Sequence, residues 1–286
     1  MRKKIIVILG QTAAGKSALA VQIAKKVNGE VISADSRQVY KGLDIGTGKI
    51  TKHEMQGIPH HMLNIANPKD RFTVVQFKNL SEKKIKQIIK SGKTPIICGG
   101  TGFYIDAVTK GVIFPEVPAN KKLRVKLEVL SLPSLLSILK KLDKKRLKTI
   151  DQKNKVRIIR AIEIVKALGK VNPLKNRVPD YEFIKIGLCL SKEELHYNIE
   201  ERVNKMFKDG LIKEIQKLKK IGIPDKRLKE FGFEYYNPTK DSVIKGTIKY
   251  AKRQMTWFKR DNDIKWYELK DKKGYQQIEK YILSRL

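Results

Sequence analysis

The sequence is poor in cysteine, in acidic residues and in long apolar runs. It has only two cysteines, Cys98 and Cys189, in 286 residues, which is too few for a disulfide framework. Because both lie in apolar stretches, we expect buried, reduced thiols and a cytoplasmic protein. No apolar run approaches the roughly 20 residues of a membrane-spanning helix. The apolar run near the start is too short for a signal peptide, so we expect no membrane partner.

Acidic residues are scarce relative to basic ones. The chain has 62 Lys and Arg against 29 Asp and Glu, a net charge of +33. The imbalance is densest in residues 111–170, which carry 16 basic and 5 acidic residues. Because so many cations cannot be paired internally, a polyanion partner is favoured, and nucleic acid is the leading class. With 41% hydrophobic residues, the chain still has the apolar content of a folded protein.

Short apolar runs alternate with helical patterns over the first 110 residues. This alternation predicts a parallel sheet covered by helices on both faces. Residues 111–170 show helical patterns and no convincing strand, which predicts a helical insertion between two parts of the sheet domain. The predicted strands are 4–9, 30–34, 94–98, 183–190 and 264–269, and the predicted helices are 16–27, 72–90, 102–110, 121–130, 134–142, 154–168, 192–220, 242–260 and 274–285.

The segment GQTAAGKS matches the phosphate-loop pattern G-x-x-x-x-G-K-S in full. It follows a predicted strand and opens a predicted helix, the setting in which such a loop binds phosphate. Lys16 would reach the outer phosphate, and the Ser17 hydroxyl would bind Mg²⁺. The pattern indicates a diphosphate-bearing ligand without deciding which one. The residues assigned to diphosphate are Gly10, Gln11, Thr12, Ala13, Ala14, Gly15, Lys16 and Ser17.

This loop makes the predicted fold an α/β fold of the P-loop NTPase type, with a parallel sheet and flanking helices. We expect residues 1–110 and 171–286 to form its core, with a small helical insertion at 111–170 that contacts the nucleic acid. Both expectations rest on the alternation of strands and helices and on the distribution of charge.

A polar cluster follows the second predicted strand. Asp35 lies at the end of that strand and therefore beside the phosphate loop, because parallel strands end at one edge of a sheet. Its carboxylate could hold Mg²⁺ through water, accept a proton from a nucleophile, or cap a turn. Ser36, Arg37 and Gln38 stand next to this candidate base. The glycines between 42 and 48 predict a flexible or tightly turned loop.

Two further motifs lie in the first 110 residues. The segment GGTG follows the third strand, so Thr101 would face the phosphate site unless the segment is a plain turn. The segment PHHMLNI pairs two histidines at 60–61. With no cysteine or further histidine at ligand spacing, we reject a zinc site and expect histidines bonded within a loop.

Two basic segments each allow two interpretations. Arg157 and Arg160 stand three residues apart on a predicted helix, where they could bind phosphates or pair with nearby acids such as Glu163. The segment KYAKRQMTWFKR mixes basic residues with Trp257 and Phe258. That mixture suits stacking on nucleic acid, and it equally suits a tryptophan packed in the core from an amphipathic helix.

The chain resembles the tRNA dimethylallyltransferase family in six segments, which run in order from about Gly10 to Arg260. The resemblance implies transfer of a dimethylallyl group from dimethylallyl diphosphate to tRNA, giving isopentenyladenosine. The acceptor would be the exocyclic 6-amino group of the adenosine just 3′ of the anticodon. The six segments are GQTAAGKS, SADSRQVYKGLDIGTGK, PHHMLNI, ICGGTGFY, VRIIRAIEI and AKRQMTWFKR.

The resemblance also implies roles for matching residues. Asp35 would be the general base, with Lys16 and Thr101 as further catalytic residues, Ser17 as the metal ligand and Mg²⁺ as the cofactor. The implied partners are dimethylallyl diphosphate and the anticodon arm of tRNA, and we expect a monomer. The implied tRNA contacts are Asp35, Ser36, Arg37, Gln38, Thr101, Arg124, Val156, Arg157, Ile158, Ile159 and Arg160.

The sequence departs from the family pattern at three places. Asn64 stands where the family usually has Asp, and Gln76 stands where an acid usually precedes the phenylalanine that is Phe77 here. The segment between Glu128 and Asn154 is shorter than usual, which predicts a trimmed helical insertion. These departures concern loops rather than the reaction.

Two alternative functions remain from the motifs alone, and a third possibility is a close relative of the reaction that the resemblance implies. A small-molecule kinase would explain the phosphate loop but would leave the basic insertion without a use. A nucleic-acid-stimulated ATPase would need an acidic residue at the end of a strand, and TPIICGG offers none. An isopentenyltransferase acting on free adenosine nucleotide would not need a charge of +33.

Overall fold

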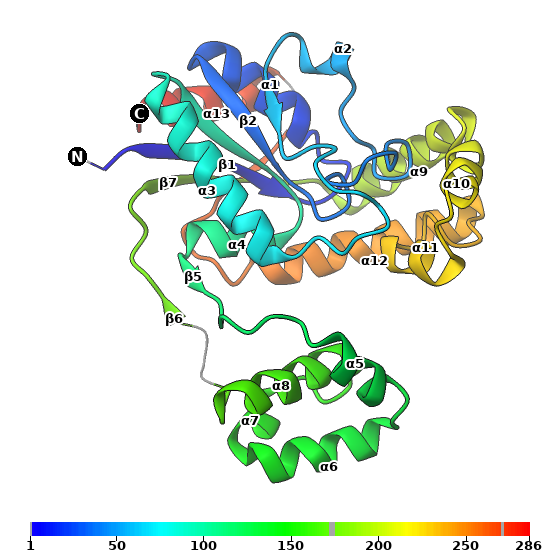
Figure 1. The fold of residues 1–286 in the computed structure, drawn as a ribbon. Helices are drawn as coiled ribbons and strands as arrows, with labels where there is room; N and C mark the ends of the chain where they lie inside the picture. The colour runs from blue at the N-terminus through cyan, green and yellow to red at the C-terminus, as the bar shows by residue number, and fades with distance from the viewer. Residues whose placement is uncertain (1, 172–174, 270–271) are drawn as a thin grey trace. The chain divides into compact units, whose positions relative to one another are not determined.

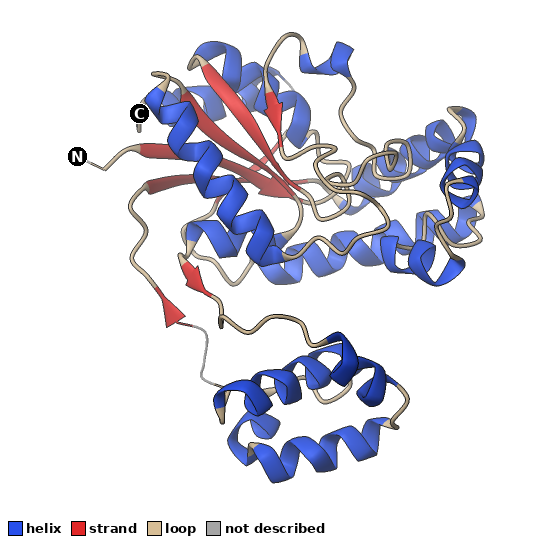
Figure 2. Cartoon of the chain, viewed as in Figure 1, coloured by secondary structure: helices blue, strands red, loops and turns tan. Residues whose placement is uncertain are grey.

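The computed structural model describes residues 2–171, 175–269 and 272–286. Its centre is a six-stranded sheet in the order β3-β2-β4-β1-β7-β8, in which all neighbouring strands are parallel (Figures 1 and 2). The prediction of an α/β fold with a parallel sheet is therefore confirmed. The strands are β1 (Lys4–Gly10), β2 (Gly29–Ala34), β3 (His60–His61), β4 (Thr94–Gly99), β7 (Glu182–Cys189) and β8 (Lys265–Glu268).

Helices cover both faces of the sheet because its central strands are apolar on both sides. Along β1, Ile6 and Ile8 face one cluster, which α1 and α13 complete. Val7 and Leu9 face the other cluster, which α3, α4 and the end of α12 complete (Figure 1). These helices are α1 (Lys16–Lys26), α3 (Val74–Lys90), α4 (Gly102–Thr109), α12 (Lys240–Phe258) and α13 (Lys272–Leu283).

A further group of helices packs against the loop that follows β2. Val39, Tyr40 and Leu43 of this loop share a core with three helices. The predicted long helix over 192–220 is two helices, because Gly210, with φ 102°, ends the first and begins the second. The three helices are α9 (Lys192–Lys208), α10 (Leu211–Lys220) and α11 (Asp225–Phe231). The loop itself contains a short helix, α2 (Lys52–Met55), which was not predicted.

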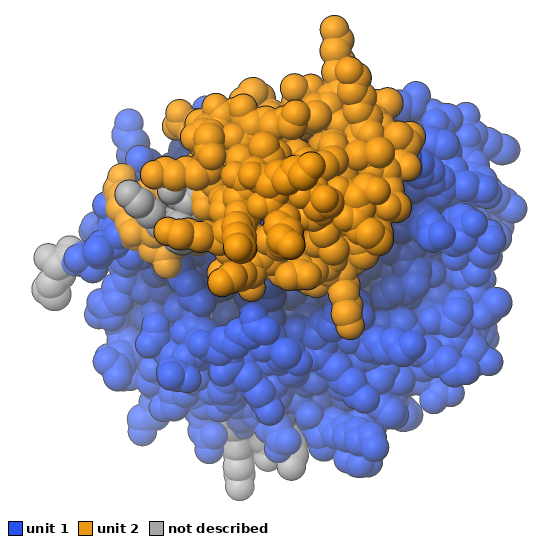
Figure 3. All heavy atoms as spheres, turned by 90° about the horizontal axis from the view of Figure 1, so that it is seen from below, with its two compact units in different colours: residues 1–111, 178–286 blue, residues 112–177 orange. Residues whose placement is uncertain are grey.

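The chain divides into two compact units, residues 1–111 with 178–286, and residues 112–177 (Figure 3). The predicted insertion covered residues 111–170, so the smaller unit extends further along the chain than predicted. Helices of the smaller unit share a core that includes Leu135, Leu139 and Ile162. An antiparallel pair of strands, where no strand was predicted, also belongs to this unit. Its elements are β5 (Val112–Ile113), α5 (Lys121–Glu128), α6 (Leu132–Leu142), α7 (Lys144–Thr149), α8 (Lys155–Leu168) and β6 (Lys175–Asn176).

In the described part of the chain, no helix combines the length and the apolar character that crossing a bilayer requires.

Candidate active site

The phosphate loop is held open by backbone conformations that favour glycine. Gly10 has φ 133°, and a Cβ atom there would lie 2.1 Å from the carbonyl oxygen of Leu188 on the neighbouring strand. Gly15 has φ 77° and precedes α1, which begins at Lys16 without a side-chain cap. The free N–H groups of the first turn of α1 can therefore accept an anion, as expected of a phosphate loop.

A cavity of about 500 Å³ lies where β1, β2 and β4 end. It brings together three predicted groups: the loop residues 12–17, Asp35 with Arg37 and Gln38, and the start of GGTG. Gly10, Gln11, Ser36 and Thr101 are not among its lining residues. Thr101 instead accepts a hydrogen bond from the backbone N–H of Ser36 (3.0 Å) and so fixes the turn after β2.

Lys16 is mostly buried, and its ammonium group donates a hydrogen bond to the backbone carbonyl of Gln11. Burial lowers the pKa of Lys16 to about 8, with Cys98 and Asp35 acting in the opposite direction and Arg202 adding to the decrease. A lysine with such a pKa is still largely charged at neutral pH, so it can bind a diphosphate there.

Asp35 both caps a turn and presents a free oxygen. Its Oδ1 accepts hydrogen bonds from the backbone N–H groups of Arg37 (2.8 Å) and Gln38 (3.2 Å). Oδ2 makes no hydrogen bond within the described residues, and Asp35 lines the cavity. The turn cap and the proton acceptor, considered as alternatives from the sequence, therefore use different oxygens of one carboxylate.

The guanidinium of Arg37 contacts two neighbouring side chains. Its Nη1 lies 2.5 Å from Oε2 of the buried Glu234. Its guanidinium lies 5.4 Å from the ring centroid of Tyr250. Burial alone would lower the pKa of Arg37, but the Glu234 carboxylate raises it above the ordinary value. This arginine is therefore a permanent cation in the cavity wall, held in one orientation.

Arg202 is a cavity residue that the sequence analysis missed. It extends from α9, lines the cavity, and donates a hydrogen bond from Nη2 to the carbonyl of Thr47 (3.0 Å). Burial, together with the nearby Arg37, lowers its pKa. In the sequence, Arg202 lies beside Ile199 and Val203 on the apolar face of an amphipathic helix. A cation is unusual at such a position, and this could have marked Arg202 as a candidate functional residue.

Gln254 of α12 joins the loops that follow β1 and β4. Its Oε1 accepts a hydrogen bond from the N–H of Thr12 (2.8 Å), and its Nε2 donates to the carbonyl of Gly100 (2.9 Å). The phosphate loop and GGTG are thus braced by one side chain. Gln254 was not among the predicted site residues.

Trp257 is partly buried and packs against the sheet core. Its indole N–H donates to Asp106 of α4 (3.1 Å), and a Cβ atom at Gly102 would lie 2.2 Å from its ring. Phe258 is buried in the sheet core. The stacking of these two rings on a nucleic acid is therefore the wrong interpretation of the motif, and the core-packing interpretation is correct.

The paired histidines form the edge strand β3 rather than a loop. The imidazole Nδ1 of His60 is hydrogen-bonded to the carbonyl of Ile58 (2.8 Å). His61 Nε2 lies 2.6 Å from a carboxylate oxygen of Glu30. Both side chains thus support the strand edge, and His60 also lines the cavity.

Both single-residue departures from the family pattern have a structural account. Gln76 forms the capping box of α3: its side chain accepts from the N–H of Thr73 (2.9 Å), as an acid would. Asn64 has φ 56°, a left-handed conformation that asparagine tolerates, and its Oδ1 accepts a hydrogen bond from Lys49 Nζ (2.6 Å). Neither departure disturbs the cavity.

In the helical unit, Glu163 organises two of the predicted tRNA-binding arginines. Its buried carboxylate lies 2.8 Å from Arg124 Nη2 and 2.6 Å from Arg160 Nη1. Burial alone would raise the pKa of Glu163, but these two guanidinium groups lower it to about 2. The pairing with Glu163 that the sequence analysis considered for Arg160 is therefore present, and Arg124 shares it.

The stretch 156–160 presents different side chains to solvent and to the core. Val156 is 76% exposed, whereas Ile158 and Ile159 are buried in the core of the helical unit. The side chains of Ile158 and Ile159 therefore cannot contact RNA, which corrects their assignment. Arg157 is exposed, and its guanidinium lies 3.9 Å from Asp151.

The donor set of the cavity fits a hard cation that binds together with a diphosphate. Ser17 and Asp35 supply a hydroxyl and a carboxylate to the same cavity. Mg²⁺ typically takes one or two protein oxygens and completes its shell with substrate phosphates and water. Among the described residues there is no cluster of three or more His, Cys, Asp or Glu side chains that would form an all-protein metal site.

The comparisons with known proteins point to one family. The model of the family described as IPP transferase matches residues 38–261. A tRNA dimethylallyltransferase of Caldanaerobacter subterraneus subsp. tengcongensis is 39% identical over 311 residues, which cover 100% of this chain and 98% of that protein. One from Anoxybacillus flavithermus is 38% identical, covering 95% of this chain and 92% of that protein.

Solved structures agree with the sequence relatives. The tRNA isopentenylpyrophosphate transferase of Bacillus halodurans superposes with a TM-score of 0.73 at 34% identity, covering 99% of this chain and 96% of that one. A eukaryotic dimethylallyltransferase acting on tRNA superposes with a TM-score of 0.82 at 28% identity, covering 96% of this chain and 75% of that one.

Proposed function

Because the chain belongs to the IPP transferase family, we propose that it transfers a dimethylallyl group from dimethylallyl diphosphate to tRNA. The acceptor is the exocyclic 6-amino group of the adenosine 3′ of the anticodon. The observation that carries this proposal is the shared cavity. A phosphate loop with two cations, Lys16 and Arg202, opens into the same space as the free oxygen of Asp35. Diphosphate and a proton acceptor are the two groups that this transfer requires.

In the proposed reaction, the bond between the allylic carbon and the diphosphate oxygen breaks as the bond from the adenine nitrogen forms. Lys16, Arg202 and the N–H groups at the start of α1 stabilise the negative charge that collects on the leaving diphosphate. The proton of the amino group passes to Oδ2 of Asp35. Mg²⁺, held by Ser17 and the diphosphate, would supply further positive charge.

Thr101 acts in this proposal through Ser36. Its hydroxyl holds the turn that follows Asp35, so it positions the base. Gln38, whose Nε2 lies 3.3 Å from the carbonyl of Thr47, has its amide fixed at the cavity wall. Such fixed polar groups suit the recognition of an adenine that has left its stack, as base-modifying enzymes require.

Two basic surfaces support tRNA as the partner. The helical unit exposes Arg157 together with many lysines of its helices. In the larger unit, the solvent side of α12 carries no acid between Asp241 and Asp261. Such surfaces suit the phosphates of a folded RNA arm. The exposed basic residues of α12 are Lys240, Lys245, Lys249, Lys252 and Arg253.

The proposed setting is a cytoplasmic monomer. One chain provides all the cavity residues named for the reaction, so a second copy is not needed to complete the site. Cys98 and Cys189 are free thiols, as suits a reducing compartment.

The direct test is incubation with labelled dimethylallyl diphosphate and bulk tRNA that lacks the modification. We expect label in isopentenyladenosine after nucleoside analysis, and none with free adenosine nucleotide as acceptor. Binding of tRNA should weaken steeply with salt, since each phosphate contact releases counterions. RNA-stimulated ATP hydrolysis without prenyl transfer would favour the ATPase alternative.

Arg157 and Arg160 provide a matched pair for testing the RNA contact. Arg157→Ala should weaken tRNA binding and reduce the salt slope by about one, with an unchanged melting temperature. Arg160→Ala should destabilise the helical unit by about 1–3 kcal/mol, because the buried Glu163 loses a partner. The measurements are binding titrations at several salt concentrations and thermal melts. An unchanged slope for Arg157→Ala would remove this residue from the interface.

A further inference from the structure

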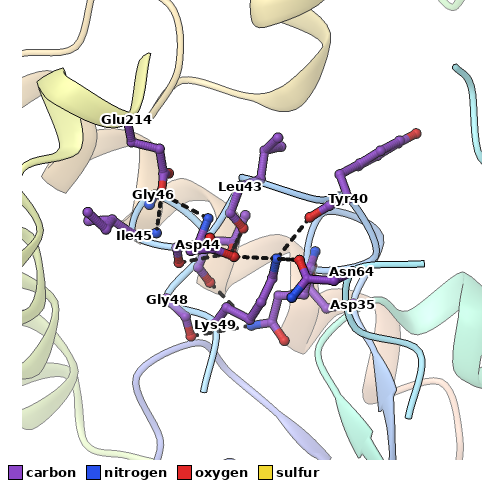
Figure 4. Close-up of polar contacts among 12 residues, drawn as sticks. Asp35, Tyr40, Leu43, Asp44, Ile45, Gly46, Gly48, Lys49, Asn64 and Glu214 are labelled. Atoms are coloured by element: carbon purple, nitrogen blue, oxygen red, sulfur yellow. Dashed lines mark hydrogen bonds and ion pairs between the residues drawn. The ribbon is translucent and has the colours of Figure 1, made fainter. Parts of the chain in front are cut away.

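A buried carboxylate outside the cavity holds the loop that follows β2. Glu214 of α10 is 8% exposed and accepts hydrogen bonds from three successive backbone N–H groups (Figure 4). The distances are 3.0 Å from Asp44, 2.7 Å from Ile45 and 3.1 Å from Gly46. Tyr235 donates a fourth hydrogen bond, at 2.9 Å. Within the described residues Glu214 has no ion-pair partner, so its charge is directed at the loop.

The end of this loop forms part of the cavity wall. The carbonyl of Thr47 accepts from Arg202 Nη2 (3.0 Å) and from Gln38 Nε2 (3.3 Å). Gly48 has φ 55°, and a Cβ atom there would lie 2.1 Å from Arg202 Nη2. The position of residues 47 and 48 therefore determines where the Arg202 guanidinium and the Gln38 amide can lie.

A second anchor holds the other side of the loop. The side chain of Lys49 is 5% exposed, and its ammonium group is bonded to the carbonyl of Tyr40 (2.8 Å), Asp44 Oδ1 (2.6 Å) and Asn64 Oδ1 (2.6 Å). Figure 4 shows Lys49 and Glu214 on opposite sides of the turn. The loop is thus tightly turned rather than flexible, and Glu214 is its anchor on the α10 side.

We propose that Glu214 is a positioning residue for prenyl transfer, which fixes residues 44–48 and thereby holds Arg202 against the diphosphate. This inference rests on the proposed function. A carboxylate suits the task because both of its oxygens accept hydrogen bonds. In a glutamine, an NH₂ group replaces one of these two oxygens. In either orientation of the amide, this NH₂ group would face a backbone N–H donor, and that N–H would lose its hydrogen bond.

The test measures binding of inorganic diphosphate and the kinetics of prenyl transfer in Glu214→Gln. We expect about tenfold weaker diphosphate binding and a matching fall in kcat/KM for dimethylallyl diphosphate, the scale of one lost charge-assisted contact. The affinity for tRNA should change little. The matched control is Glu230→Gln, a substitution on α11 that removes ion pairs to Arg71 and Arg227 and leaves the contacts of residues 44–48 in place.

A double mutant separates positioning from mere stabilisation. If Glu214 acts through Arg202, then Glu214→Gln combined with Arg202→Gln should be no worse than Arg202→Gln alone. Additive effects, or wild-type diphosphate binding in Glu214→Gln, would overturn the proposal. If Glu214→Gln does not fold, Glu214→Asp takes its place, because a shorter carboxylate cannot reach all three N–H groups; the same non-additivity is then required.

The two proposals fail separately. A wild-type protein that binds inorganic diphosphate but transfers no prenyl group to tRNA would reject the proposed function. Weaker diphosphate binding by Glu214→Gln would still support the positioning role in that case. A wild-type protein that does not bind diphosphate would overturn both.

Discussion

Replacing Asp35 by asparagine is expected to lower the single-turnover rate of prenyl transfer by about 10²–10⁴, the usual contribution of a positioned base. Asparagine can place its amide oxygen where Oδ1 accepts from Arg37 and Gln38, so the turn is kept. Its NH₂ group at the other position cannot take a proton. The affinities for dimethylallyl diphosphate and tRNA should change little, because the lost interaction belongs to the transition state.

Asp35→Ala is the companion variant, since it removes the cap together with the base. It should lose the same factor in rate and also about 1 kcal/mol of stability, the usual effect of a lost cap. If Asp35 serves mainly the metal, added Mg²⁺ should partly rescue Asp35→Asn, and its diphosphate affinity should fall. A near wild-type rate in Asp35→Asn would leave Asp35 as a turn cap only.

Lys16→Ala is expected to reduce kcat/KM for dimethylallyl diphosphate by about 10²–10³, as when one preorganised donor to a developing anion is removed. The effect should be large because Lys16 is mostly buried, where its charge is poorly screened. Steady-state kinetics with saturating tRNA would measure it. Equal losses for Lys16→Ala and for a surface lysine such as Lys83→Ala would contradict the assignment.

The pKa of Lys16 predicts that the activity depends on pH. Because burial lowers it to about 8, the ammonium loses its proton as the pH rises through that value, and the attraction for diphosphate is lost with it. The kcat/KM for dimethylallyl diphosphate should therefore fall between about pH 7 and about pH 9. In Lys16→Arg the guanidinium stays charged, so any residual activity should lack this decline. If kcat/KM of the wild type did not change over this pH range, the pKa of Lys16 would lie outside it.

The parts of the site that lie at strand ends could be predicted from the sequence. The phosphate loop and Asp35 each follow an apolar run directly, and the topology of a parallel sheet then brings them to one edge. Arg202, Glu214 and Gln254 could not be found in this way. They come from α9, α10 and α12, and only the packing of these helices decides which side chains reach the cavity or its supporting loop.

Helical segments with two interpretations show a related limit. Arg160 and Trp257 each lie on amphipathic helices, where periodicity separates a buried face from an exposed one but does not locate side chains at the border. The structure pairs Arg160 with Glu163 and packs Trp257 on α4. The partner of Arg160 is an acid three residues further along the same helix, which local spacing allows but does not select. The partner of Trp257 is Asp106, which is distant in the sequence and therefore not visible in local spacing.

On the ribosome, β1 emerges among the first residues but receives its neighbour β7 only after residue 182 has been made. Until then, one edge of β1 carries unpaired backbone groups between apolar side chains, the kind of edge that pairs with other chains. The helical unit, synthesised in between, can fold around its own core meanwhile. Gln254 braces the phosphate loop later still. Synthesis that stops within the helical unit would thus release an aggregation-prone half-sheet, and diphosphate binding becomes possible only near the end of translation.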